Sequence, residues 1–237
     1  MPLILCLETA TKSCSVSLGQ KGKVLALKES LDEKYSHSEN LTLFIEDVCK
    51  EAKVRLQDVD AIAVSKGPGS YTGLRIGVST AKGLCYALDK PLIAINTLEA
   101  MAVQMHKPLR KESFGQATSH KSLFMPMIDA RRMEVYCTLY DEEMKEIKKT
   151  SAEIIDENSF ADLLQNNKIY FFGDGAAKCR EKISHPNAIF VDGIHPSARF
   201  MISLAENFFA EGKFEDVAYF EPFYLKDFVS TMPMPSP

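Results

Sequence analysis

The chain has 237 residues, of which 46% are hydrophobic and 25% charged, and these proportions exclude a collagen-like, coiled-coil or wholly disordered protein. A formal net charge of −4, from 28 basic and 32 acidic residues, gives no global field that would draw the protein onto a phosphate backbone or an anionic lipid surface. At this length roughly 70% of the unfolded surface becomes buried, which is enough for one large domain or two packed lobes.

The cysteines and the apolar runs indicate the compartment. None of the six cysteines forms a C-x-x-C pair with another, which is typical of reduced, buried thiols in a cytosolic protein. The N-terminal apolar run 2–7 lacks a basic flank and is too short for a signal peptide. No other stretch approaches the roughly 20 apolar residues that cross a bilayer. We therefore expect a cytoplasmic protein without membrane contact.

The first half of the chain is predicted to begin with a three-stranded meander. Residues 3–7 form a continuous apolar run, typical of a strand buried on both faces, and Glu8 follows directly. Alternation over 13–18 and the turn before 24–27 predict two further strands. The elements expected next are a helix over 38–54 with Ser38 as N-cap, a strand over 61–65, a helix over 72–88, a strand over 92–95 and a helix from about residue 97.

The second half is predicted to repeat this pattern. Residues 106–122 are polar and basic, with Pro108 and Gly115 and no regular period, so we expect a linker. Beyond it, another apolar run ends at Asp129. The elements expected after it are strands over 123–128 and 135–140, a further candidate strand after 141–145, a helix over 160–165 capped by Ser159, strands over 169–172 and 189–191, and a helix from Ser197 that Gly212 closes.

This repetition predicts the domain organisation and the place of a site. We expect an N-terminal lobe over 1–105, the linker over 106–122, a C-terminal lobe over 123–229 and a disordered tail over 230–237. Each lobe carries a carboxylate, Glu8 or Asp129, from its first strand into its first turn. Two such α/β lobes that face each other form a cleft, and we expect both turns to lie there. The alternative is two ordinary strand ends that carry polar residues.

The most distinctive segment is Gly67-Pro68-Gly69-Ser70-Tyr71-Thr72-Gly73-Leu74-Arg75-Ile76-Gly77, placed between a strand and a helix. Gly67 and Gly69 permit positive φ, and Ser70 or Thr72 can cap the helix. The helix N-terminus together with Arg75 can hold an anion. The alternative is a sharp turn and close helix packing, since the loop is not G-x-x-x-x-G-K-[ST].

Together with segment 4–16, Asp129-Ala130-Arg131, Gly173-Asp174-Gly175 and the run 222–225, this loop resembles the bacterial TsaB (YeaZ) family. The family pattern is an apolar strand ending in D-T-A-T, then G-P-G-S-[FY]-T-G-L-R-I-G, then D-A-R. The resemblance runs from residue 3 to about residue 225. One departure is Glu8, which stands where the family usually has aspartate.

The resemblance implies an α/β fold of the duplicated actin, sugar-kinase and Hsp70 type. It also implies a role in making threonylcarbamoyladenosine beside the anticodon of tRNAs that read codons beginning with A. In that pathway a paralogue, TsaD, transfers the threonylcarbamoyl group, and this chain would be its non-catalytic scaffold and activator. The implied partners are the TsaD-like paralogue, a TsaE-like ATPase, tRNA indirectly through the complex and, for the chain alone, a second copy.

The residues favour a non-catalytic role on their own terms. Ala10 places a Cβ in the turn where close approach to a phosphate favours glycine, so we expect weakened ATP binding and no cofactor. The five histidines, at 37, 106, 120, 185 and 195, are never four apart, so we expect no metal site of the paralogue's kind. The residues assigned to a vestigial ligand cleft are Glu8, Thr9, Thr11, Gly67, Gly69, Ser70, Asp129, Arg131 and Gly173.

A scaffold needs a docking surface, and the helices over 38–54 and 72–88 are the candidates. In the family, such a pair serves both self-association and pairing with the paralogue. Because the chain's own sheet uses most apolar positions, we expect partner contacts through smaller or amphipathic residues. These residues are Tyr71, Arg75, Ser79 and Lys82.

Two other functions stay open at this point. One is an ATPase or small-molecule phosphotransferase of the same fold, with Glu8 and Asp129 holding a divalent metal. The other is direct tRNA binding through a basic run, which is more often a solvated loop. The residues of that run are Lys107, Arg110, Lys111 and Lys121.

Overall fold

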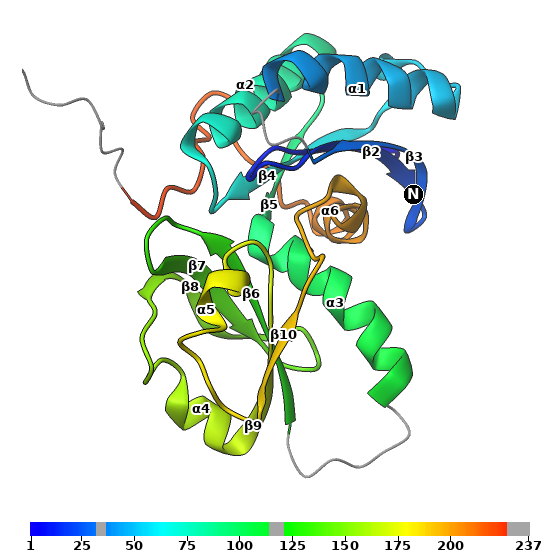
Figure 1. The fold of residues 1–237 in the computed structure, drawn as a ribbon. Helices are drawn as coiled ribbons and strands as arrows, with labels where there is room; N and C mark the ends of the chain where they lie inside the picture. The colour runs from blue at the N-terminus through cyan, green and yellow to red at the C-terminus, as the bar shows by residue number, and fades with distance from the viewer. Residues whose placement is uncertain (32–36, 114–120, 227–237) are drawn as a thin grey trace, which may run out of the picture.

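The computed structural model describes residues 1–31, 37–113 and 121–226, with only the backbone described at 37 and 106–113. Its framework is two five-stranded mixed sheets (Figure 1). The first sheet has the order β3-β2-β1-β4-β5, from β1 (Ile4–Glu8), β2 (Cys14–Gln20), β3 (Lys23–Ser30), β4 (Ala61–Gly67) and β5 (Leu92–Asn96). The second has the order β10-β9-β6-β7-β8, from β6 (Lys121–Asp129), β7 (Glu134–Tyr140), β8 (Glu146–Ile154), β9 (Asn167–Phe172) and β10 (Ala188–Val191).

The two sheets have the same topology, which confirms the predicted duplication. In each sheet the first strand of the half pairs antiparallel with the second and parallel with the fourth. β6 therefore corresponds to β1, and the turn after Asp129 corresponds to the turn after Glu8. Because β1 and β6 are each the central strand of their sheet, the turn that follows each of them lies at the middle of that sheet.

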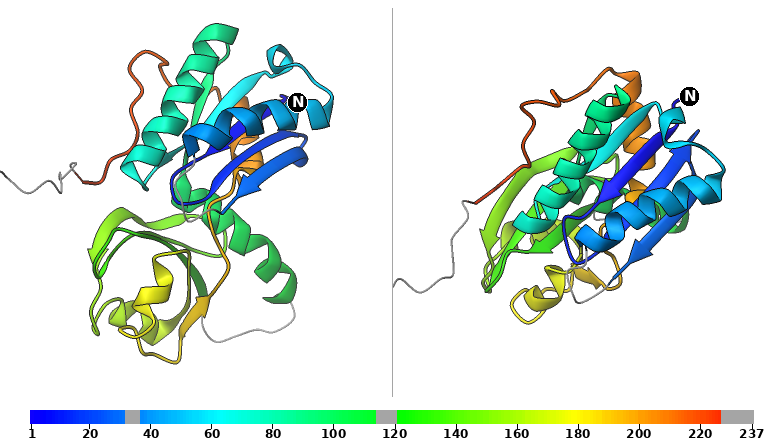
Figure 2. Two further views of the ribbon diagram at one scale, coloured as in Figure 1. Left: turned by 45° about the horizontal axis from the view of Figure 1, so that its top comes forward. Right: turned by 90° about the horizontal axis from the view of Figure 1, so that it is seen from above.

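Helices and sheets alternate in five layers (Figure 1). The helices are α1 (His37–Ala52), α2 (Tyr71–Leu88), α3 (Thr97–Ser113), α4 (Ala161–Asn166), α5 (Ala176–Cys179) and α6 (Ile202–Ala210), with 3₁₀ turns η1 (Leu56–Asp58) and η2 (Ala198–Phe200). α1 and α2 lie side by side on the outer face of the first sheet (Figure 2). α4 and α5 cover the outer face of the second sheet. α3 and α6 lie between the two sheets.

The packing of the two middle helices crosses the order of the chain. α6 belongs to the second half, yet its Ile202 and Ala205 pack in one buried cluster with Ile4 and Ile93 of the first sheet. α3 belongs to the first half, yet its Met101 packs in a buried cluster with residues of the second sheet. Each half therefore supplies a helix that completes the core of the other half.

Some predicted boundaries are wrong. α3 continues through Pro108 to Ser113, and β6 begins at Lys121, so the linker predicted over 106–122 is wrong at both ends. Pro108 has no amide hydrogen to donate within α3, but the helix continues past it. Ser38 lies inside α1, and Phe160 rather than Ser159 is the N-cap of α4. The short helix α5 had not been predicted. The expected tail over 230–237 lies outside the described residues.

Residues 215–226, here called the C-terminal strap, run back along the first half beside α2 (Figure 2). The strap begins where the amide of Glu215 donates to the carbonyl of Leu92 at 2.9 Å, and the amide of Phe223 donates to the carbonyl of Lys66 at 2.7 Å. Phe220 packs against the apolar cluster beneath α1 and α2. The strap therefore closes one side of the first half.

All six cysteines are buried and free, as predicted. Burial raises the pKa of Cys14, Cys85 and Cys137 to about 12, so these thiols stay protonated at neutral pH. Among the described residues, no helix is both long and apolar enough to cross a membrane.

Candidate functional site: a cleft between the two halves

A cleft of about 700 Å³ lies where the two halves face each other, at the turns that follow β1 and β6. Five segments form its walls: the first turn, the start of α2 with the loop before it, the turn between β6 and β7 with the strand ends beside it, the loop after β9, and the end of the C-terminal strap. The lining residues are Ala10, Thr11, Lys12, Pro68, Gly69, Ser70, Tyr71, Thr72, Ile128, Asp129, Ala130, Arg131, Arg132, Glu134, Tyr136, Asp174, Phe223, Tyr224, Leu225 and Lys226.

The carboxylate of Glu8 does not face this cleft. Glu8 is completely buried, and its Oε1 accepts hydrogen bonds from the amide of Ala10 at 2.6 Å and from the Ser65 hydroxyl at 2.8 Å. Its Oε2 is buried without a hydrogen-bond partner. Burial raises the pKa of Glu8 to about 7, although the bonds from Ala10 and Ser65 oppose the shift. Glu8 therefore lies behind the cleft and not in its lining, contrary to the expectation, because its carboxylate is directed to the amide of Ala10 and the hydroxyl of Ser65.

The loop before α2 packs directly on this first turn. The amide of Ser70 donates to the carbonyl of Ala10 at 2.6 Å, and a Cβ on Gly69 would lie 2.2 Å from that carbonyl oxygen. Gly69 is thus required by close approach rather than by positive φ, whereas Gly67 has a φ of +111°. The Ser70 hydroxyl accepts from the amide of Gly73 at 3.3 Å, which confirms Ser70 as a helix cap.

Thr9 connects the first turn to α2 through a buried hydrogen bond. It is completely buried, and its hydroxyl donates to the carbonyl of Gly73 at 2.8 Å. A Cβ on Gly77 would lie 2.3 Å from the Thr9 hydroxyl oxygen, so Gly77 lets the helix come this close. The first turn, the glycine loop and α2 consequently form one packed unit.

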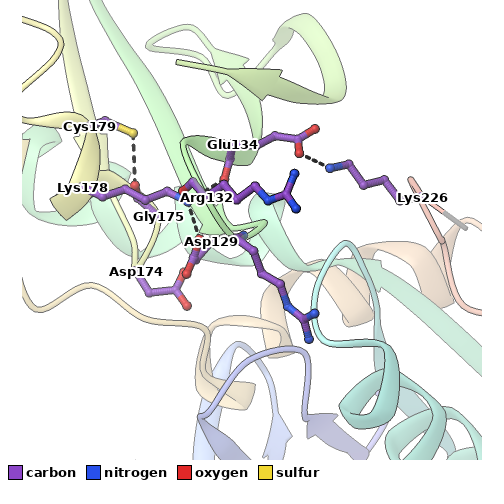
Figure 3. A network of polar contacts seen from close by, with 9 residues as sticks. Asp129, Arg132, Glu134, Asp174, Gly175, Lys178, Cys179 and Lys226 are labelled. Atoms are coloured by element: carbon purple, nitrogen blue, oxygen red, sulfur yellow. Dashed lines mark hydrogen bonds and ion pairs between the residues drawn. The ribbon is translucent and has the colours of Figure 1, made fainter. Parts of the chain in front are cut away.

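The second turn presents its carboxylate outward (Figure 3). Asp129 forms an ion pair with Lys178 of α5, and its Oδ1 also accepts from the amide of Arg131 at 2.9 Å. Lys178 donates further to the carbonyls of Arg132 and Glu134, each at 2.7 Å. Glu134 in turn pairs with Lys226 at the end of the C-terminal strap. Lys178 thus joins three groups of the second turn, whose backbone is also closed by hydrogen bonds from the amide of Ala130 to the carbonyl of Glu134 at 3.1 Å and from the amide of Glu134 to the carbonyl of Arg131 at 3.2 Å.

The loop after β9 supports the second turn as the glycine loop supports the first. The amide of Asp129 donates to Asp174 Oδ1 at 3.1 Å, and a Cβ on Gly173 would lie 2.2 Å from the carbonyl oxygen of Met127. Loss of hydration in the cleft raises the pKa of Asp174, and the charge of Asp129 adds to this shift.

The structure therefore divides the residues assigned to the cleft. Those that line it are Thr11, Gly69, Ser70, Asp129 and Arg131. Those that lie behind its walls are Glu8, Thr9, Gly67 and Gly173. The sequence analysis did not assign Lys12, Arg132, Tyr224 or Lys226 to the cleft. The pair of adjacent arginines at 131 and 132 was a signal for Arg132, and the run 222–225 was a signal for Tyr224.

Of the four residues predicted for partner contacts, three contact the C-terminal strap and one is exposed on α2. The Arg75 guanidinium lies 4.2 Å from the centre of the Tyr71 ring, and its Nε donates to the Tyr224 hydroxyl at 3.3 Å. Lys82 donates to two strap carbonyls, of Ala218 at 3.1 Å and of Phe220 at 2.9 Å. Tyr71, Arg75 and Lys82 therefore hold the C-terminal strap, while Ser79 is exposed on α2.

The described residues include no group of three or more His, Cys, Asp or Glu side chains arranged to hold a metal ion. Of the predicted basic run, Lys121 is exposed at the start of β6. The side chains of Lys107, Arg110 and Lys111 lie outside the described ones.

Comparison with known proteins identifies relatives over almost the whole chain. A family described as tRNA N6-adenosine threonylcarbamoyltransferase, TsaD, matches residues 32–219. The tRNA threonylcarbamoyladenosine biosynthesis protein TsaB of Escherichia coli (strain K12) is 30% identical over 238 residues, which cover 98% of each chain. The Haemophilus influenzae protein of the same name is 27% identical over 241 residues, 98% of this chain and 97% of that one. Of the solved structures, YeaZ from Pseudomonas aeruginosa superposes with a TM-score of 0.75 at 26% identity and covers 95% of this chain and 100% of that chain.

Two sheets of one topology, a helix from each half between them and a cleft at their paired turns define the α/β fold of the actin and sugar-kinase type. Within that fold, the similarity to TsaB proteins runs from end to end. The chain belongs to the TsaB (YeaZ) family.

Proposed function

We propose that this protein is a non-catalytic scaffold and activator of a TsaD-like transferase that attaches threonylcarbamoyl to the adenosine beside the anticodon of tRNA. Its relatives carry the name of that biosynthesis, and the family matched over 32–219 is the transferase itself. The site of action would be the cytoplasm. The chain would contact tRNA only through the complex, and a TsaE-like ATPase would be a further partner.

The observation that carries the proposal is the closed first turn. In a phosphate-handling turn the backbone must approach oxygen atoms of the ligand. Here the carbonyl of Ala10 already accepts the amide of Ser70, and the amide of Ala10 is bonded to Glu8. The turn therefore satisfies its groups within the protein, which supports a structural role.

The docking surface that we propose is the exposed face of α2 together with the neighbouring part of α1. Thr72, Arg75, Ser79 and Tyr86 are exposed at spacings of three, four and seven, and so lie along one side of α2. Tyr86 is 88% exposed, and Leu43 of α1 is 57% exposed. Tyrosine and arginine are enriched at the centres of protein–protein interfaces, and the exposed Tyr86 and Arg75 fit that composition. In the absence of the transferase, the same surface would pair two copies of this chain.

Substitution of Ser79 tests the surface. Ser79→Arg places a long charged side chain in the middle of the α2 face, and we expect at least a tenfold loss of affinity for the TsaD-like paralogue. Stimulation of tRNA modification in a reconstituted reaction should fall in parallel. Calorimetry gives the affinity, and incorporation of labelled threonine into tRNA gives the stimulation.

The matched control is Ser184→Arg, which makes the same change at an exposed serine in the second half. This variant should bind and stimulate as the unmodified chain does. If the unmodified chain fails to bind the paralogue, and modification runs equally fast without it, the scaffold proposal is lost.

The alternative, an ATPase or phosphotransferase, requires Glu8 and Asp129 to act together on one metal. Glu8 is completely buried and engaged with Ala10 and Ser65, whereas Asp129 is paired with Lys178. Hydrolysis of Mg-ATP by the chain alone, lost on Glu8→Ala, would support the alternative against this geometry.

A further inference from the structure

α2 carries two charged residues, Arg75 and Lys82, and both are basic. The Arg75 Nε donates to the hydroxyl of Tyr224 in the C-terminal strap at 3.3 Å. Lys82 donates to the strap carbonyls of Ala218 at 3.1 Å and Phe220 at 2.9 Å. Among the described side chains, neither cation takes part in an ion pair. The hydrogen bonds of both cations to the strap therefore end on neutral oxygen atoms.

The C-terminal strap is held less firmly than the helix beside it. None of its residues is buried, and it contains no helix and no strand. Backbone hydrogen bonds join it to the rest of the first half through the amides of Glu215 and Phe223. α2, by contrast, buries a row of residues that includes Leu74, Val78 and Ala81. A segment without buried side chains opens at a smaller cost in free energy than a packed helix, so the strap can leave while α2 stays in place.

Carboxylates are stronger acceptors for these two cations than the neutral oxygen atoms of the strap. A hydrogen bond between two ionised groups is shorter and stronger than one to a neutral acceptor, and a guanidinium fork binds both oxygens of one carboxylate. α2 carries no acidic residue, although the chain as a whole has a formal net charge of −4. Arg75 and Lys82, here called the basic site, therefore form a local positive charge that fits an acidic surface.

The basic site overlaps the docking surface proposed above. Figure 2 shows the strap along one side of α2 and α1 along the other side. Arg75 belongs to the exposed row of α2 with Ser79 and Tyr86, yet its guanidinium is bound to the strap. A partner that binds Arg75 must therefore compete with Tyr224 for it.

We propose that the C-terminal strap is a displaceable cover of the basic site, and that carboxylate groups of the TsaD-like transferase replace it on Arg75 and Lys82. The inference rests on the proposed function and adds to it the chemistry of the partner's contact surface. In the free chain the strap lowers the affinity for the transferase, since its contacts to α2 must be given up on binding. Binding of the transferase and release of the strap are thereby coupled.

Amide hydrogen exchange followed by mass spectrometry tests the displacement directly. The whole chain is measured alone and with saturating TsaD-like paralogue, in peptides that cover the strap and in peptides that cover α2. In the complex we expect the amides of Phe220 and Phe223 to exchange about tenfold faster or more, because they lose their bonds to the carbonyls of Asp216 and Lys66. The amides of α2 should exchange more slowly. Slower or unchanged exchange of the strap in the complex would overturn the proposal.

Variants on the two sides of the contact should change the affinity in opposite directions. On the strap, Tyr224→Phe removes the acceptor of Arg75, and Phe220→Ala removes a ring that packs against the first apolar cluster. We expect the two changes together to raise the affinity for the paralogue about threefold or more. On α2, Lys82→Met and Arg75→Gln also free the strap, but they remove the cations that bind the carboxylates. Their affinity, measured by calorimetry, should fall about fivefold or more.

Lys145→Met is the matched control for the loss of a lysine, because Lys145 is exposed in the second half. This variant should change neither the exchange of the strap nor the affinity. Thermal unfolding checks that each variant is folded. Tyr224→Phe alone, which loses one hydroxyl group, keeps the test valid if Phe220→Ala destabilises the chain.

The outcomes separate this inference from the proposed function. If the strap variants bind the paralogue more weakly, the strap is part of the docking surface and not its cover, and if they bind it equally, the strap has no role in docking. An affinity that Lys82→Met and Arg75→Gln leave unchanged means that no carboxylate contacts the basic site. Each of these results overturns the inference and leaves the scaffold role intact, whereas an unmodified chain that does not bind the paralogue ends both.

Discussion

The first turns of the two halves occupy equivalent positions, yet their carboxylates point in opposite ways. Glu8 ends β1, is completely buried and bonds to its own turn. Asp129 ends β6, has a side chain that is 48% exposed and pairs with Lys178. The duplicated topology therefore fixes the position of each turn but not whether its carboxylate is buried or exposed. In the first half the turn has become part of the core, and in the second it remains open to the cleft.

The largest effects are expected from substitutions that disturb the packing of the two glycine-containing loops, one against each half's first turn. Gly69→Ala would place a Cβ 2.2 Å from the carbonyl oxygen of Ala10, an atom that cannot move without breaking its bond from Ser70. We expect a loss of about 3 kcal/mol in the free energy of unfolding, measured by urea denaturation. Gly173→Ala should cost at least as much, since Gly173 also has a φ of +103°.

Gly83→Ala is the control for these two variants. Gly83 lies inside α2, and a Cβ there would meet nothing within 4 Å. Alanine should therefore stabilise the protein by about 0.5–1 kcal/mol through its better helix propensity. Equal effects at the three glycines would show that the loops do not depend on close contact with the turns.

The buried Glu8 should make the free energy of unfolding depend on pH. Its pKa is raised to about 7, so between pH 4.5 and 7 the folded protein holds a proton that the unfolded chain releases. This stabilisation is complete below the unfolded value and is lost as the pH rises through 7. Glu8→Gln removes the titration. The difference in unfolding free energy between the two proteins should therefore change by about 3 kcal/mol from pH 4.5 to 8.

The two proteins share every other titratable group, so the comparison isolates Glu8. Urea denaturation at several pH values gives the two curves. Parallel curves across this range would mean that Glu8 is ionised at little cost in the folded protein, and that the closed first turn is wrongly described.

The smallest expected effect concerns Lys178, which holds the second turn open. Lys178→Met keeps the aliphatic stem but removes the ion pair to Asp129 and the bonds to the carbonyls of Arg132 and Glu134. We expect a loss of about 1–2 kcal/mol. Lys182→Met is the control, because its pair with Glu157 is exposed to solvent and should contribute much less to stability. If both substitutions cost the same, the second turn keeps its shape without the lysine.

The sequence predicted the sheets well because buried strands have a strong local signal. The apolar runs that end at Glu8 and Asp129 correspond to β1 and β6, and the alternating segments after them correspond to β2 and β7. The duplication, the two α/β halves and the cleft between them could be predicted from these patterns, whereas the actin, sugar-kinase and Hsp70 type of fold was implied by the family resemblance. The direction of the Glu8 side chain could not, since it depends on the distance between β1 and Ser65 of β4.

The C-terminal strap and the full lining of the cleft were also missed because they depend on contacts between residues that are distant in sequence. Nothing in residues 215–226 has a helical or strand period, so the C-terminal strap and its hold on Arg75 and Lys82 had no local signal. The meeting of Lys12 and Arg131 in the lining of one cleft also arises only in the fold, because the two residues are distant in sequence.

The exchange of α3 and α6 between the halves has a consequence for dissecting the protein. A fragment that ends after α3 would keep the first sheet but leave the inner face around Ile4 and Ile93 without Ile202 and Ala205. A fragment that begins at β6 would lack Met101 against its own sheet. Neither piece could bury its apolar surface alone, so separately expressed fragments should fold only by complementing each other.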